Sequence, residues 1–138
     1  MGVFAITVSP SLIEELEQVK QTNDDYQALL LQGVCDRLAE ATSEWLHREV
    51  RMRLWGYSPD EQLSLKDLSR AAYQGIRPAV GYPSLPDQQL IFPISRLLDF
   101  KALGIKLTEN GAMYPQSSTC GLYLSSPHAT YFMVSKQD

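Results

Sequence analysis

The sequence is poor in the features that mark several common classes of protein. It has only two cysteines, Cys35 and Cys120, too few for a disulfide framework and without the spacing of a metal site. Glu44 and His47 form one Glu-x-x-His step, but the second copy that a di-iron bundle needs does not occur, so we expect no metal. No apolar run approaches the ~20 residues of a membrane-spanning helix, and the net charge of −4 provides no basic face for nucleic acid. We therefore expect a cytoplasmic protein with buried free thiols that binds neither membranes nor nucleic acid.

The rest of the composition favours a single compact domain over residues 1–138. Hydrophobic residues make up 44% of the chain, enough for a core, and no internal repeat or linker-like tract divides it. Periodicity and turn signals predict strands at 3–8, 105–108, 119–124 and 130–134, and helices at 11–21, about 24–54, 64–75 and 93–102. The last two strands are expected to pair as an antiparallel hairpin. We predict an α+β fold in which helices pack on a twisted antiparallel sheet.

The long helix, capped by Asn23 or Asp24 and ended near Gly56, has two distinct faces. An apolar stripe, typical of a face that packs on a core, is formed by Leu30, Val34, Leu38, Ala41 and Trp45. Another face carries polar side chains at i, i+4, i+7 and i+11, namely Asp36, Glu40, Ser43 and His47. Such a polar stripe is either a solvated surface or part of a ligand site, and the pattern alone favours the solvated surface.

An unusual loop is predicted at Arg77-Pro78-Ala79-Val80-Gly81-Tyr82-Pro83-Ser84-Leu85-Pro86-Asp87. Its prolines fix backbone angles and remove N–H donors, so the segment is neither a regular helix nor a regular strand. Gly81 allows the backbone to approach a ligand closely, and Arg77 offers a planar guanidinium suited to a carboxylate. The loop is therefore either a rigid connector or a site for a small anionic ligand, and composition alone favours the connector.

These residues resemble a known family. Arg-Pro-Ala-x-Gly-Tyr-Pro at 77–83, followed by Pro86-Asp87, is similar to the signature of the activation domain of cobalamin-dependent methionine synthase. Further similar segments, in the family's order, are Asp36-Arg37-Leu38-Ala39-Glu40-Ala41, Leu46-His47, Trp55-Gly56-Tyr57, Tyr73-Gln74-Gly75-Ile76, Lys106-Leu107-Thr108-Glu109, Ala112-Met113-x-Pro115, Gly121-x-Tyr123, Ser125-x-Pro127 and Tyr131. The resemblance runs from about Phe4 to Val134 and so covers nearly the whole chain.

The resemblance implies a repair function. In this family, cobalamin that has oxidised to inactive cob(II)alamin is restored by an electron from flavodoxin or a similar reductase and by a methyl group from S-adenosylmethionine (AdoMet). The activation domain binds AdoMet and presents its methyl group to the cobalamin, so we expect no catalytic nucleophile in this chain. The implied partners are a cobalamin-binding protein or module and a flavodoxin-like electron donor.

The resemblance also implies which residues form the AdoMet site. The expected ligand-binding residues are Glu40, Arg77, Ala79, Gly81, Tyr131 and Phe132. Arg77 would bind the α-carboxylate of the ligand, and Glu40 its cationic part. Asp36 corresponds to a family residue that faces the cobalamin-bearing module. From the residues alone, Tyr131 is equally well a core aromatic, and Tyr82 is expected to pack under the loop.

Departures from the family leave two functions open. Gln88-Gln89-Leu90-Ile91 replaces a charged segment, and the similarity covers only the second half of the usual domain, without the half that supplies an aspartate to the ligand site. One function is an AdoMet-binding reactivation module that acts in trans or as a fragment. The other is a non-catalytic interaction domain that docks on a corrinoid protein without binding AdoMet. A sheet edge left open by the absent half would permit a homo-oligomer.

Overall fold

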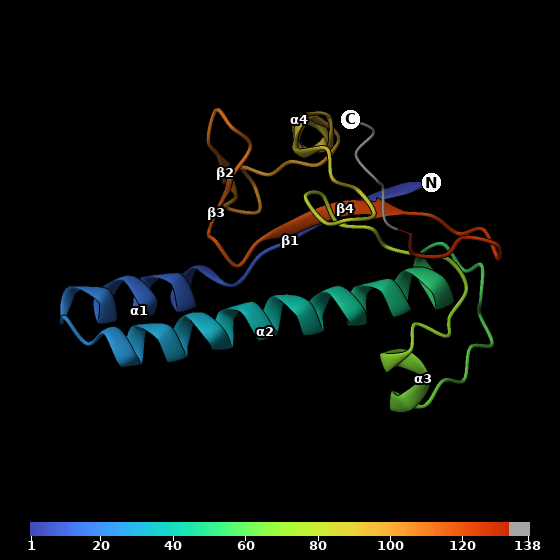
Figure 1. Cartoon of the computed structure of the whole chain (residues 1–138), viewed down its shortest axis with the longest axis horizontal. Coiled ribbons are helices and arrows are strands. Elements are labelled where there is room, and N and C mark those ends of the chain that lie inside the picture. The colour runs from blue at the N-terminus through green and yellow to red at the C-terminus, as the bar shows by residue number, and fades with distance from the viewer. Residues whose placement is uncertain (133–138) are drawn as a thin grey trace.

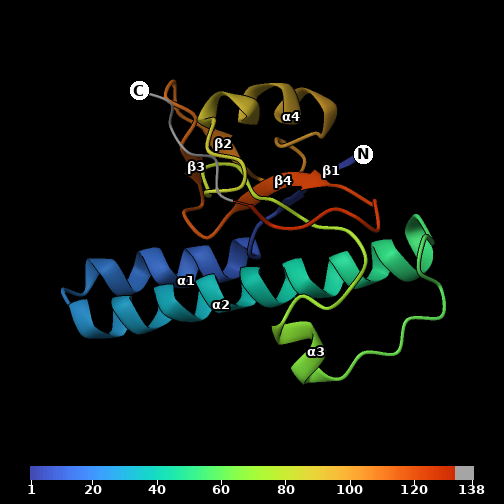
Figure 2. The same cartoon turned by 45° about the vertical axis from the view of Figure 1, so that its right-hand side comes forward.

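The computed structural model describes residues 1–132 and places helices on both sides of a small sheet. The strands β1 (Gly2–Ile6) and β4 (Thr119–Tyr123) lie between the long helix α2 (Asp25–Glu49) and the short helix α4 (Ile91–Leu97), as Figure 1 shows. The other elements are α1 (Pro10–Gln21), a π-helical turn (Val50–Leu54), α3 (Leu65–Ser69), a 3-10 turn (Gln88–Leu90), β2 (Lys106–Leu107) and β3 (Met113–Tyr114). Figure 2 shows α1 running back along α2. The predicted α+β class, with helices packed on an antiparallel sheet, is confirmed.

Both ends of α2 follow the local sequence. The side chain of Asp24 accepts a hydrogen bond of 2.9 Å from the backbone N–H of Gln27, which satisfies a free donor of the first turn. At the other end the helix widens into the π-helical turn, and Gly56 stops it with a φ of +72°, a conformation that favours glycine. The expected cap and terminator are both confirmed.

The face of α2 that packs on the sheet is not the predicted one. Its buried residues are Cys35, Ala39, Ser43 and His47. The expected core stripe is exposed instead: Leu30, Val34, Leu38 and Trp45 keep 53%, 50%, 44% and 58% of their surface in contact with solvent. The physical reason is the close approach of α2 to the sheet. Small side chains on the inner face of the helix leave room for Phe4 and Tyr123, which project from the sheet.

The sheet joins the two ends of the described chain. β1 pairs with β4 in antiparallel register from Gly2 opposite Tyr123 to Ile6 opposite Thr119. The opposite edge of β4 is occupied by the proline-containing loop: the N–H of Val80 donates to the carbonyl of Cys120 at 2.9 Å. The N–H of Leu122 donates to the carbonyl of Pro78 at 3.0 Å, so the loop follows β4 almost as a strand would.

The predicted hairpin between 119–124 and 130–134 is therefore wrong. Both edges of β4 are already hydrogen-bonded, one to β1 and one to the loop, so no edge remains for a partner. Thr130, Tyr131 and Phe132 are irregular, while 133–134 lie outside the described residues. The strand predicted at 105–108 forms as β2, which pairs with β3 in an antiparallel hairpin with Lys106 opposite Tyr114.

Two predicted helices are shorter than expected. Ser64 and Asp67 form a capping box at the start of α3, but the helix ends at Ser69 rather than near Gly75. The helix predicted at 93–102 begins at Ile91 and ends at Leu97, since Leu98 is already extended. Pro93 lies in the first turn of α4, where its missing N–H is tolerated.

The sheet divides the core into two clusters. The cluster between the sheet and α2 contains Phe4, Ile6, Val8, Cys35, Ala39, Val50 and Tyr123. The cluster on the α4 side contains Val80, Ile91, Ile94, Phe100, Ile105 and Cys120. Both cysteines are free and buried, as expected. None of the helices in residues 1–132 is both long enough and apolar enough to cross a membrane.

Candidate functional site

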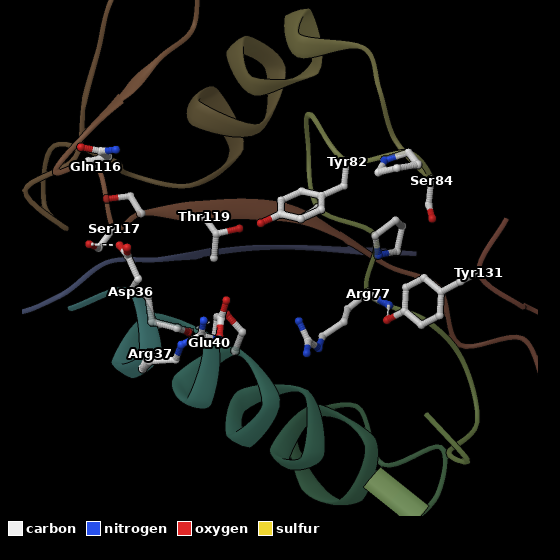
Figure 3. A pocket seen from close by; sticks show the side chains of 16 residues that line it. Asp36, Arg37, Glu40, Arg77, Tyr82, Ser84, Gln116, Ser117, Thr119 and Tyr131 are labelled. Atoms are coloured by element: carbon white, nitrogen blue, oxygen red, sulfur yellow. Dashed lines mark hydrogen bonds and ion pairs between the residues drawn. The ribbon is translucent and has the colours of Figure 1, made fainter. Parts of the chain in front are cut away.

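A cavity of about 730 Å³ lies between α2 and the proline-containing loop (Figure 3). Its lining residues are Asp36, Arg37, Ala39, Glu40, Ser43, Arg77, Pro78, Ala79, Tyr82, Pro83, Ser84, Gln116, Ser117, Ser118, Thr119 and Tyr131. Four segments far apart in the sequence therefore form its walls: one face of α2, the loop, the segment that leads into β4, and the segment that contains Tyr131. The volume falls within the range of small-molecule sites.

Arg77 is held at the cavity wall by contacts at both of its ends. Its backbone N–H donates to the hydroxyl of Tyr131 at 3.1 Å, and its Nη2 donates to Oε2 of Glu44 at 2.9 Å. Burial disfavours the charged guanidinium, but the hydrogen bond and the charge of Glu44 outweigh this and raise the pKa of Arg77 above its usual value. The cavity therefore contains a permanent cation on a partly buried side chain.

The α2 wall supplies the opposite charge. Asp36 and Glu40 lie one helical turn apart and face the cavity (Figure 3). Asp36 Oδ1 accepts hydrogen bonds from Ser117 at 2.6 Å and from Gln32 at 2.9 Å, which ties α2 to the segment before β4. Glu40 pairs with Arg37 at 2.6 Å on the exposed surface. The site thus presents both signs of charge to one ligand.

The start of the loop forms a tight turn that presents Ala79. The N–H of Tyr82 donates to the carbonyl of Ala79 at 3.2 Å, and Gly81 has a φ of +86°, as the third residue of a type II turn requires. Gly81 itself does not line the cavity. Opposite the loop, a Cβ on Gly121 would lie 2.2 Å from the carbonyl oxygen of Pro78, so only glycine permits β4 and the loop to approach this closely.

Of the three aromatic side chains considered from the sequence, Tyr82 and Tyr131 line the cavity and Phe132 does not. Tyr82 lines the cavity with 62% of its surface exposed, so the prediction that it packs under the loop is wrong. Tyr131 is 44% exposed and also lines the cavity, which excludes the core-aromatic alternative. Phe132 is 55% exposed and is not among the lining residues. Of the six residues expected to bind ligand, the structure brings Glu40, Arg77, Ala79 and Tyr131 to one cavity.

A buried polar cluster lies beneath the site. His47, at the inner end of the polar face of α2, is fully buried, stacks on Tyr123 and shares a hydrogen bond of 3.3 Å with the hydroxyl of Tyr57. Burial, together with the charges of Arg51 and Arg77, lowers the pKa of His47 to about 3. The polar stripe of α2 is therefore solvated at Asp36 and Glu40 but forms part of the core at Ser43 and His47.

Sequence reasoning missed Glu44 as the partner of Arg77 and missed the segment at Gln116, Ser117, Ser118 and Thr119 as a wall of the cavity. Glu44 lies one turn after Glu40 on the same helix, but this spacing alone does not indicate that Arg77 pairs with it. The segment at 116–119 had no local signal in the sequence, because the pairing of β1 with β4 is what brings this segment to α2. No group of three or more potential metal ligands occurs among residues 1–132.

Comparison with known proteins identifies the family and the fold. The family described as "Vitamin B12 dependent methionine synthase, activation domain" matches residues 1–138. The chain belongs to this family. A solved activation-type domain, described as the MetH reactivation domain bound to AdoHcy, is 42% identical and has a TM-score of 0.89. That match covers 95% of this chain and 41% of the other, so this chain spans less than half the length of that domain.

Proposed function

We propose that the chain is an AdoMet-binding reactivation module. It would support the reductive methylation of cob(II)alamin in a cobalamin-dependent methionine synthase or related corrinoid protein, acting in trans or as part of a longer chain. The observation that supports this most strongly is the cavity where Arg77 and Glu40 converge, in a chain 42% identical to a domain solved with AdoHcy, the demethylated form of AdoMet.

The side chains around the cavity fit the chemistry of AdoMet. Its amino-acid part carries a carboxylate, which would bind Arg77, and an ammonium group beside a sulfonium cation, which would lie toward Glu40. The backbone at Ala79 is accessible because its own side chain is small, and Tyr131 offers an aromatic face at the rim. Ligand contacts of Gly81 and Phe132, which do not line the cavity, stay predictions.

The partner module would approach from the side of Asp36. The cobalamin on that partner supplies the nucleophile for methyl transfer, so this chain's contribution is to hold AdoMet in a fixed position and orientation. Asp36 is already oriented by Ser117 and Gln32, which prepares its carboxylate for a contact across an interface. A flavodoxin-like electron donor and self-association are further proposals, which co-sedimentation with candidate proteins and sedimentation of the chain alone would test.

A second function is a corrinoid-protein docking domain without AdoMet affinity. The observation that favours it is the extent of the match, since 41% of the AdoHcy-bound domain has a counterpart here. The neutral segment that begins at Gln88 favours it less than the sequence suggested. Gln88 has a structural role, because its Nε2 donates to the carbonyl of Gly111 at 2.7 Å and joins the loop to the hairpin of β2 and β3.

Calorimetric titration of the full chain with AdoMet and AdoHcy separates the two functions. Micromolar binding that Arg77→Ala weakens by about tenfold or more, while the exposed control Arg70→Ala leaves it intact, would support the reactivation module. Absence of binding to the folded wild-type chain would favour the docking domain. Co-purification with a cobalamin-loaded partner, weakened by Asp36→Asn, would then test docking on its own.

A further inference from the structure

Glu44 contacts the site only through another residue. It does not line the cavity, yet its Oε2 accepts the hydrogen bond from Nη2 of Arg77 at 2.9 Å. The two side chains are partly buried, with 25% of Arg77 and 31% of Glu44 exposed. Figure 3 shows the Arg77 side chain directed from the loop toward α2. The guanidinium of Arg77 therefore lies against α2 at the position of Glu44.

The contact leaves part of the guanidinium available. Only Nη2 is used, and among residues 1–132 the Nη1 atom has no hydrogen-bond partner. Within the described part of the chain, the Nε of Arg77 and the Oε1 of Glu44 are also buried without hydrogen-bond partners, so neither side chain has its full set of hydrogen bonds there. A guanidinium has five N–H groups, and a ligand carboxylate can bind beside Glu44 without displacing it.

A second Arg–Glu pair in the same chain makes a useful contrast. Arg51 binds Glu61 through both Nε and Nη2, at 2.6 Å each, and both side chains are almost fully buried. That pair is closed in the sense that its carboxylate occupies one whole edge of the guanidinium. The Glu44–Arg77 pair has the same residue types but makes a single contact at a cavity wall. This contact leaves the rest of the Arg77 guanidinium available to a further partner.

We propose that Glu44 is a positioning residue for ligand binding: it holds the Arg77 guanidinium at the cavity wall so that the carboxylate of an adenosyl amino acid meets a preorganised cation. The inference rests on the proposed function. Without the charge of Glu44, the long side chain of Arg77 is free to turn toward solvent, and the ligand must order it on binding. The loss of affinity therefore concerns contacts with the amino-acid end of the ligand and not contacts with its adenosine.

The test compares two ligands that differ at that end. AdoHcy carries the α-carboxylate, whereas 5′-methylthioadenosine has the same nucleoside and thioether without it. We expect Glu44→Gln to weaken AdoHcy binding about fivefold, the size of coupling found between contacting residues, and to leave methylthioadenosine binding unchanged. Glu17→Gln removes a carboxylate from an exposed pair with Lys20 on α1 and serves as the matched charge control.

A double-mutant cycle assigns the effect to Arg77. In the Arg77→Gln background, Glu44→Gln should cause no further loss of AdoHcy affinity. Equal weakening of both ligands, no weakening of either, or a loss that persists without Arg77 would each overturn the proposal. These outcomes are distinct from failure of the proposed function, in which the wild-type chain would bind no AdoHcy at all.

A measurement that uses no ligand tests the role of Glu44 even if the wild-type chain binds no AdoHcy. Phenylglyoxal modifies accessible arginines, and mass spectrometry reports the rate at Arg77 separately from other sites. We expect Glu44→Gln to accelerate modification of Arg77 while thermal stability and the rate at Arg70 stay unchanged. An unchanged rate at Arg77 would show that Glu44 does not hold the guanidinium, and would overturn the proposal.

Discussion

The guanidinium of Arg51 is bound through two hydrogen bonds to the carboxylate of Glu61 and lies 4.2 Å from the centre of the Tyr73 ring. The pair joins the π-helical turn after α2 to the irregular segment that follows this turn. Because Arg51 has no exposed surface, its charge depends on Glu61 for compensation.

We expect Glu61→Ala to lower the free energy of unfolding by about 3–5 kcal/mol, since it leaves a buried cation without its partner. Urea unfolding monitored by circular dichroism would measure the change. Glu17→Ala, which breaks an exposed pair, should cost less than about 1 kcal/mol. A loss no larger than that of this control would mean that water reaches Arg51.

Arg77→Ala is expected to weaken AdoHcy binding by about 1.5–3 kcal/mol, the range for a hydrogen bond to a charged group. Titration calorimetry measures the dissociation constant directly. Arg70→Ala changes the same residue type on the exposed end of α3 and should leave the constant unaltered. An unaltered constant in Arg77→Ala would remove this side chain from the ligand site.

Gly81 tests the turn that presents Ala79. Its φ of +86° is unfavourable for a residue with a Cβ, and an added Cβ would lie 2.9 Å from Oε1 of Gln88. We expect Gly81→Val to cost about 1–2 kcal/mol of stability and to weaken ligand binding as Ala79 moves. Gly81→Asn, which tolerates positive φ, should cost less. Equal stability of the three proteins would show that the turn adapts to any residue.

His47 makes stability depend on pH. Its pKa in the folded protein is about 3, below the ordinary value of 6.5, so between these pH values the unfolded chain binds a proton that the folded chain does not. Stability should therefore fall as pH decreases through this window, by up to about 1.4 kcal/mol per pH unit. The slope of unfolding free energy against pH should decrease in His47→Phe and persist in His128→Phe. An unchanged slope in His47→Phe would assign the acid sensitivity to other groups.

Local signals in the sequence were good guides to both ends of α2 and to the start of α3. Asp24 caps α2, Gly56 ends it, and Ser64 with Asp67 forms the capping box of α3. Each of these features depends on residues within one or two helical turns of each other, so no knowledge of the tertiary structure is needed to recognise them.

Contacts between distant segments were harder to predict. The inner face of α2 carries small residues and a histidine, so hydrophobicity pointed to the wrong face, with Leu30 and Leu38 as its core. The pairing of β1 with β4 joins segments near opposite ends of the described chain, and no local sequence signal predicts this pairing. In the site, the chemistry of Arg77 already suggested a carboxylate ligand, and the family resemblance added Glu40. Glu44 was missed because the choice of ion-pair partner depends on how the loop crosses α2.

The division of the core by the sheet gives each cysteine its own compartment. Cys35 lies in the cluster against α2, and Cys120 in the cluster against α4. Burial raises the pKa of both thiols, so neither reacts readily while its layer stays closed. The rates of thiol labelling therefore report two local opening motions separately. Modification of Cys35 reports the separation of α2 from the sheet, and modification of Cys120 reports the separation of α4 from the sheet.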